Sequence, residues 1–172
     1  MKSNTISIIA VVLLVFVGLF VWGYADNGET TAPVNVAPGS ASMSKSVLTA
    51  PEIFYDFGTI SMKNGNVTKE FTVENTTDQD IKVSTVLTSC MCTSAFIVLP
   101  DGNIKGPFKM PGMGYVPPAN ETIKAGENRI IRVVYDPNAH GPAGVGRINR
   151  FVTLTDTSGG TVQLEIKALV TP

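Results

Sequence analysis

Residues 162–170 read Val-Gln-Leu-Glu-Ile-Lys-Ala-Leu-Val, and this stretch decides the fold class. Apolar side chains occupy every second position, and Gln163, Glu165 and Lys167 stand between them. Because the side chains of a β-strand point alternately to opposite faces, one face of this strand packs against a core and the other meets water. Residues 71–74, Phe-Thr-Val-Glu, repeat the alternation. We therefore predict an all-β domain.

The chain after Pro51 consists of short β-branched and aromatic runs that are separated by Gly, Pro, Asn and Asp. Such spacing is typical of a sandwich, and no stretch here has helical periodicity. Residues 99–120 are rich in Gly and Pro, so we predict a long loop there that offers a recognition surface. The predicted strands number about seven, as an immunoglobulin-like β-sandwich requires. They cover residues 53–54, 57–60, 67–74, 81–88, 129–135, 148–155 and 162–170.

An apolar segment precedes this domain. Residues 6–24 are apolar apart from Ser7, and a helix of that length spans the hydrocarbon core of a bilayer. We predict that residues 1–25 form a single transmembrane anchor; a signal peptide cleaved after Ala25 is the alternative. The basic Lys2 favours a cytoplasmic N-terminus, which places the rest of the chain outside the cytoplasmic membrane.

Two segments follow the anchor. Residues 26–50 contain Ala, Pro, Ser, Thr, Asn and Gly without an apolar run, and we predict a flexible linker. Residues 51–172 then form the sandwich domain.

The composition restricts the partners and the activity. The chain has 13 Lys and Arg against 14 Asp and Glu, so it lacks the basic surface that nucleic acid requires. It has a single histidine, no nucleophile elbow and no phosphate-binding glycine loop. We expect a protein or cell-envelope component as the partner, no nucleic acid, and no enzyme activity.

Four short motifs follow one another along the domain. They are Tyr55-Asp56-Phe57-Gly58-Thr59-Ile60, Phe71-Thr72-Val73-Glu74-Asn75, Ser89-Cys90-Met91-Cys92-Thr93 and Lys124-Ala125-Gly126-Glu127. Their order and spacing over about residues 51–172 resemble the bacterial domain-of-unknown-function family numbered 1573. The resemblance implies an immunoglobulin-like fold, related to ASH and major sperm protein domains, with a protein-binding or scaffolding role and no reaction.

This chain departs from the family pattern at one motif. The family signature reads Cys-Gly-Cys-Thr, whereas Met91 takes the middle position here, and the segment between Thr93 and Ile123 is longer than the family's usual loop. The Cys pair and the fold carry over from the resemblance, and a role for that loop does not.

Cys90 and Cys92 are the two cysteines of the chain, and they stand where the predicted strand 81–88 ends. If the extended conformation continues to Cys92, both thiols point to one face, away from the core. Outside the cytoplasm such a pair binds a metal, forms a disulfide or stays reduced. A disulfide across one residue closes a small ring, so we expect it to be strained and easily reduced.

Loop residues supply further ligands for a metal at the Cys pair. Met113 and His140 lie in predicted loops that can fold over the strand end, and Met110 stands close to Met113 in the sequence. Sulfur and imidazole donors select copper(I), so the candidate site is Cys90, Cys92, Met113 and His140, with zinc as the second choice of metal. Methionines also fill apolar gaps and loop histidines bond to backbone, which leaves a structural role as the alternative.

The sequence therefore predicts a membrane-anchored extracytoplasmic binding or scaffolding module. One alternative is an extracytoplasmic copper(I)-binding domain that uses the Cys pair with Met and His ligands. The other is a thiol-redox partner that uses the two cysteines alone.

Overall fold

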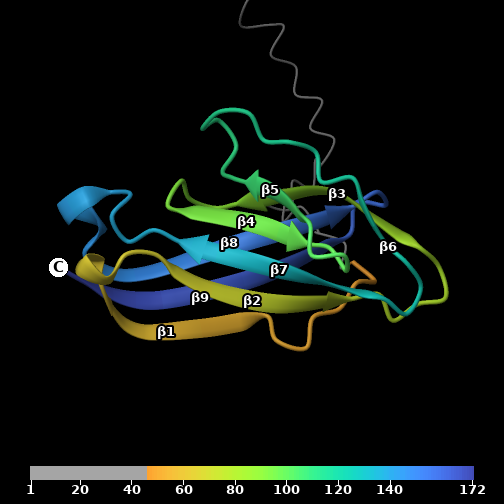
Figure 1. The fold of residues 1–172 in the computed structure, drawn as a ribbon, viewed down its shortest axis with the longest axis horizontal. Coiled ribbons are helices and arrows are strands. Elements are labelled where there is room, and N and C mark those ends of the chain that lie inside the picture. Colours follow the sequence, from red (N-terminus) through yellow and green to blue (C-terminus); the bar gives the residue numbers. More distant parts are fainter. Residues whose placement is uncertain (1–45) are drawn as a thin grey trace, which may run out of the picture. The chain divides into compact units, whose positions relative to one another are not determined.

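The computed structural model of the chain describes residues 46–172 (Figure 1). Within this range nine strands are joined by turns, loops and the short 3-10 helices η1 (Met62–Asn64) and η2 (Gly141–Gly144). The strands are β1 (Phe54–Ser61), β2 (Val67–Glu74), β3 (Ile81–Thr88), β4 (Thr93–Val98), β5 (Ile104–Phe108), β6 (Glu121–Ile123), β7 (Asn128–Tyr135), β8 (Gly146–Asp156) and β9 (Thr161–Thr171).

The predicted anchor (residues 1–25) and most of the predicted linker lie outside the described residues. Among residues 46–172, no helix has the length and apolar character needed to cross a membrane.

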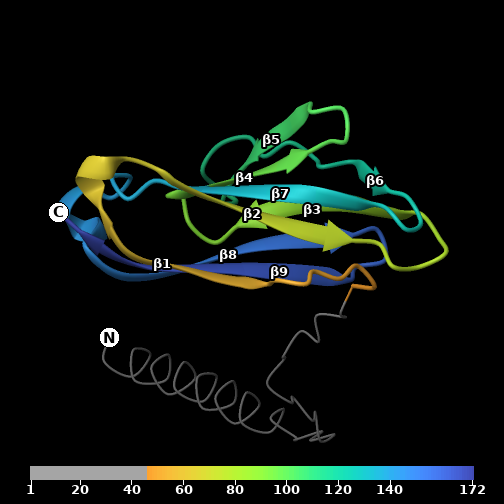
Figure 2. The same cartoon turned by 60° about the horizontal axis from the view of Figure 1, so that its bottom comes forward.

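The strands form two sheets. One sheet has the order β1-β9-β8-β3-β6 and the other β2-β7-β4-β5. Paired strands run antiparallel, except that β1 is parallel to β9. Figure 2 shows the sheets as two facing layers, with β8 and β9 in one and β4 and β7 in the other. The prediction of an all-β domain made of two facing sheets is confirmed.

The alternating strands supply the core between the layers. In β9, the five apolar positions from Val162 to Val170 are at most 8% exposed. From the other sheet, Phe71 and Val73 of β2 and Val133 of β7 are at most 1% exposed. Removal of this apolar area from water is the main stabilising term of the fold.

The number of strands differs from the prediction. Residues 53–54 and 57–60 were expected as separate pieces, but 54–61 form the single strand β1, with an irregular register between Asp56 and Thr59. The prediction also lacked β4, β5 and β6, so about seven strands was too few. The predicted bounds 67–74 and 81–88 agree with β2 and β3.

The long loop predicted over residues 99–120 is wrong in its first half, because β5 pairs with β4 there. Gly106 and Pro107 in β5 conceal the strand in the sequence, since neither residue favours a strand interior. Gly106 is required at its position. Its φ is 125°, and an added Cβ would lie 2.9 Å from the carbonyl oxygen of Ala95.

Residues 46–50, which the sequence assigns to the linker, pack onto the sandwich. Leu48 is 2% exposed, and Thr49 exchanges backbone hydrogen bonds of 2.9 and 2.7 Å with Glu74 of β2. Ser46 donates its backbone N–H to the Thr161 carbonyl, at 3.1 Å, and its hydroxyl to Asp156, at 2.5 Å. The folded unit therefore includes Ser46, and a domain boundary at residue 51 is too late.

A mostly buried ion network joins the ends of three strands. The side chains of Glu121 in β6 and Arg129 in β7 are 8% and 7% exposed, and their charged groups are 2.7 Å apart. Lys105 of β5 contacts the other Glu121 oxygen at 2.6 Å. Arg129 also donates to the Thr122 carbonyl and to Glu127. Every buried charge here has a partner, as a stable interior requires.

Candidate functional site

The connection between β3 and β4 is a tight turn that carries the Cys pair. The Thr88 hydroxyl donates to the carbonyls of Cys90 and Thr93, each at 3.1 Å, and the Thr93 N–H donates to Cys90 at 3.1 Å. These bonds fold the chain back at Thr88, so the extended conformation does not continue to Cys92. The expectation that both sulfurs point away from the core is wrong: Cys92 is 2% exposed and belongs to the core, and Cys90 is partly buried.

A disulfide joins Cys90 and Cys92, whose Cα atoms are 5.3 Å apart. The Cys92 N–H donates to the Cys90 sulfur at 3.4 Å. Of the three fates that the sequence allows for the pair, the structure has the disulfide.

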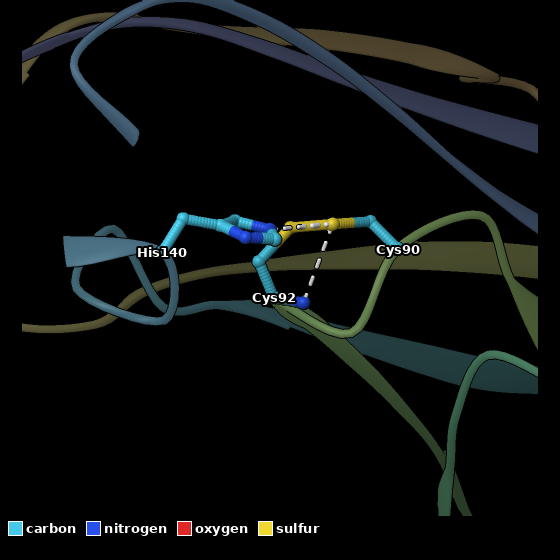
Figure 3. Close-up of side chains that lie close together, drawn as sticks. All are labelled: Cys90, Cys92 and His140. Atoms are coloured by element: carbon cyan, nitrogen blue, oxygen red, sulfur yellow. Dashed lines mark hydrogen bonds between the residues drawn. A yellow bond between two sulfur atoms is a disulfide. The ribbon is translucent and has the colours of Figure 1, made fainter. Parts of the chain in front are cut away.

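His140 reaches the Cys pair from a loop 50 residues further along the chain. Its Nε2 lies 3.2 Å from the Cys90 sulfur, as Figure 3 shows. The loop after β7 is held beside the turn because the Asp136 N–H donates to the Cys92 carbonyl at 2.8 Å. The imidazole is exposed. The structure thus places one nitrogen and two sulfur atoms within 4.8 Å of one another.

Met113 is the fourth ligand that the sequence predicts. It lies in the loop between β5 and β6, is 47% exposed, and forms no hydrogen bond to either cysteine within the described residues. Met110, which is half-buried, accepts the Met113 N–H at 3.4 Å. The loop begins near the turn, since the Thr88 N–H donates to Lys109 at 3.4 Å.

Arg150 of β8 is a site residue that sequence reasoning missed. Its Nε donates to the Cys92 sulfur at 3.2 Å, and its terminal nitrogen donates to the Asn149 carbonyl at 2.8 Å. A signal was present: Arg150 falls between Ile148 and Val152, both buried, on the inward face of its strand. A cation at an inward position needs a partner, and here that partner is sulfur.

The charge of Arg150 also acts on a neighbouring buried phenol. Burial raises the pKa of Tyr135, while the Arg150 charge lowers it and the Asp136 carboxylate raises it. The net direction is upward, so the phenol stays protonated at neutral pH.

The donor set can hold a metal ion once the disulfide is reduced, because thiolates are the ligand form of cysteine. Two sulfurs and one imidazole suit the low coordination numbers of a soft ion. Zinc needs a fourth ligand, and no Asp or Glu among residues 46–172 joins the three donors.

An open groove of about 410 Å³ lies elsewhere, on the outer face of β1, β8 and β9. Asp56, Arg147 and Lys167 line it, together with Leu169. Neither cysteine, His140 nor Arg150 lines it.

Residues 48–99 match one protein family. It is described as "Protein of unknown function (DUF1573)". The resemblance is confirmed over this range, which includes the first three of the four motifs and both cysteines, and which ends before the fourth motif, His140 and Arg150. No curated protein matches the chain.

Several solved structures are similar. A protein of unknown function from Porphyromonas gingivalis W83 matches with a TM-score of 0.51 and 14% identity, over 78% of this chain and 51% of that one. The chain thus spans about half the length of that protein, and the likeness shows the fold alone.

Two further similarities have lower TM-scores. The ASH / PapD-like domain 7 of human CEP192 gives 0.45 at 12% identity, over 76% of this chain and 91% of that one. The CupB2 chaperone of Pseudomonas aeruginosa gives 0.36 at 12% identity, over 71% and 55%.

Proposed function

We propose that the chain is a binding or scaffolding module for a protein or cell-envelope component, and not an enzyme. Its N-terminal apolar segment tethers it to the cytoplasmic membrane, with the sandwich on the outer side. The apolar run of residues 6–24 supports the tether. The Cys90–Cys92 disulfide supports the outer location, since disulfides persist in oxidising compartments.

This proposal rests on the distance between two places on the sandwich, the point where the chain enters the domain and the turn that carries the Cys pair. The chain enters the domain at Ser46, which bonds to Asp156 at the C-terminal end of β8. Arg150 and the Cys pair lie six positions back along β8, which corresponds to about 20 Å of extended strand. The turn that carries the disulfide and the point of entry at Ser46 thus lie apart on the sandwich, which suits a module that is tethered at one end and binds a partner at the other.

The surface of that turn suits a protein partner. Met91, between the two cysteines, is 42% exposed, and Ser89 and His140 are exposed beside it. A flexible thioether next to polar groups adapts to a partner surface. We call the surface formed by Ser89, Met91 and His140 the cysteine end.

Site-specific photo-crosslinking tests the proposal. A photoreactive residue in place of Met91 should give a discrete crosslinked product in membranes of cells that express the full chain. Val47, which is 57% exposed near the point of entry, is the matched control and should give none. The Met91→Glu variant, folded as judged by circular dichroism, should lose the partner. Equal crosslinking from both positions, or none from position 91, would contradict the proposal.

A second candidate is copper(I) binding by the reduced Cys pair. This candidate is favoured because the ligand atoms of Cys90, Cys92 and His140 all lie within 4.8 Å of one another. With thiolates and imidazole as donors, these three residues would hold the ion. Met113 is the candidate for a fourth ligand.

A competition titration tests the copper candidate. The reduced full chain should take up one copper(I) against a chelator of known affinity. Replacement of both cysteines by serine should abolish uptake, and His140→Ala should weaken it about tenfold or more, as loss of a ligand does. The Met113→Leu variant reports on the fourth ligand. Unchanged affinity in the double serine variant would remove the candidate.

A further inference from the structure

We propose that the Cys90–Cys92 disulfide is an exchange centre that accepts two electrons from a dithiol protein. Cys90 is the sulfur that is attacked, Cys92 is the sulfur that leaves, and Arg150 holds the leaving thiolate. This inference goes beyond the binding proposal, since it assigns a reaction and distinct roles to groups at the cysteine end.

The exposure of the two cysteine residues differs. Cys90 is partly buried and is flanked by the exposed residues Ser89 and Met91, whereas Cys92 is 2% exposed. The site of attack in thiol–disulfide exchange depends on which sulfur an incoming thiolate can reach. An external thiolate reaches Cys90, and the bond to Cys92 is then the one that breaks.

The leaving sulfur has a prepared partner. Breaking the bond leaves a negative charge on Cys92, inside the core, where an unpaired charge is costly. The Arg150 Nε already donates to this sulfur at 3.2 Å, and the Thr93 hydroxyl lies 3.7 Å from it. Arg150 carries a permanent positive charge, so the site stabilises the thiolate without a change of its own protonation.

The other sulfur faces a different group. The imidazole of His140 lies 3.2 Å from Cys90 and is exposed to solvent. A ring N–H at this distance donates to the Cys90 sulfur when that sulfur leaves in the second step. The two sulfurs thus have separate hydrogen-bonding partners on separate elements, the loop after β7 and strand β8.

The exchange balances in two steps. In the first, a thiolate of the partner attacks Cys90, a mixed disulfide forms, and Cys92 leaves as a thiolate paired with Arg150. In the second, the other partner thiol loses its proton and attacks the partner sulfur of the mixed disulfide. Cys90 leaves and takes up a proton at the His140 side. The partner dithiol is oxidised to a disulfide, and the Cys pair gains the two electrons.

Single-cysteine variants of the full chain test which sulfur is attacked. Cys92→Ser leaves Cys90 as the one thiol, and Cys90→Ser leaves Cys92. With glutathione disulfide as the reagent and mass spectrometry as the readout, the Cys90 thiol should form the mixed disulfide at least about tenfold faster, because access limits the buried thiol. Equal rates, or faster reaction of Cys92, would overturn the assignment.

Variants of Arg150 test the leaving group. In a glutathione redox buffer, Arg150→Met should lower the equilibrium constant for reduction about tenfold, since it removes a charge-assisted hydrogen bond. A tenfold change corresponds to about 30 mV for a two-electron couple. Arg150→Lys should recover most of the loss. Arg147→Met, exposed on the same strand, is the control and should leave the constant unchanged.

Two results would reject the proposal. One is a disulfide that dithiothreitol reduces only when the chain is also unfolded by urea. The other is an equilibrium constant that Arg150→Met leaves at the value of the unmodified chain. The crosslinking experiment at position 91, repeated in the Cys90→Ser, Cys92→Ser chain, separates the exchange proposal from the binding proposal. If this chain still crosslinks to the partner but no longer exchanges disulfides, binding does not depend on the sulfur chemistry.

Discussion

Replacement of Arg129 by methionine should lower the free energy of unfolding by about 3 kcal/mol, the low end of the range for breaking a buried ion pair. The change leaves the mostly buried Glu121 carboxylate without its 2.7 Å partner and removes a hydrogen bond to the Thr122 carbonyl. Lys105 stays 2.6 Å from Glu121, which keeps the loss at the low end. Unfolding in denaturant, monitored by circular dichroism, measures this loss of stability.

Arg132→Met is the matched control for this prediction. Arg132 also pairs with a glutamate, Glu70, at 2.8 Å, but the two side chains are 35% and 49% exposed. An exposed pair contributes about 0–1 kcal/mol, so the control should change stability by less than about 0.5 kcal/mol. Equal losses in the two variants would show that burial does not decide the contribution.

Replacement of Asp156 by asparagine should lower the free energy of unfolding by about 2–3 kcal/mol at neutral pH, as loss of a buried charged acceptor does. Asp156 is 4% exposed and accepts hydrogen bonds from Ser46, from Ser158 and from the Gly160 N–H. An amide nitrogen in its place would face these donors. Residues 46–50 should then detach from the hairpin of β8 and β9 before the rest of the domain unfolds. Hydrogen exchange of the amides of residues 46–50 can detect this.

The same carboxylate makes stability depend on pH. Burial alone would raise the pKa of Asp156, but hydrogen bonds from Ser158, Ser46 and Gly160 bring it below its usual value. A lowered folded pKa gives stability that is present above the unfolded pKa of about 3.9 and is lost as pH falls through the folded value. The gap between the unmodified chain and Asp156→Asn should therefore close below about pH 4.

Asp101→Asn is the control for this second prediction. Asp101 also accepts from a turn residue, Asn103, and these bonds lower its pKa, but it lies on the exposed hairpin between β4 and β5. Its replacement should leave the unfolding midpoint unchanged. A shift like that of Asp156→Asn would mean that the turn geometry, and not burial, is responsible.

Sequence reasoning found the strands in which buried apolar residues alternate with exposed polar residues. In β9 every inward residue is apolar, and in β2 Phe71 and Val73 are, so the predicted bounds agree with β2 and fall one residue short of β9 at each end. In β4 the inward residues are Thr93, Ala95 and Ile97, while the large Phe96 is on the other face, so the alternation is hidden. The strand β6 has only three residues, too few for a pattern.

The candidate site was predictable in composition but not in arrangement. The sequence identifies Cys90, Cys92 and His140 because each is rare in this chain. Their proximity depends on a bond from Asp136 to Cys92 that joins two loops far apart in the sequence. Strand parity places Arg150 on the inward face with Ile148 and Val152, but its contact with the Cys92 sulfur depends on the packing of β8 against the turn between β3 and β4.

The sequence Gly106-Pro107 in β5 has a consequence for copies of the chain that meet edge to edge. β5 is the outermost strand of its sheet, and proline offers no N–H to a neighbouring backbone. A second copy cannot extend the ladder along this border without losing a bond. Open-ended polymerisation from this side is thereby discouraged.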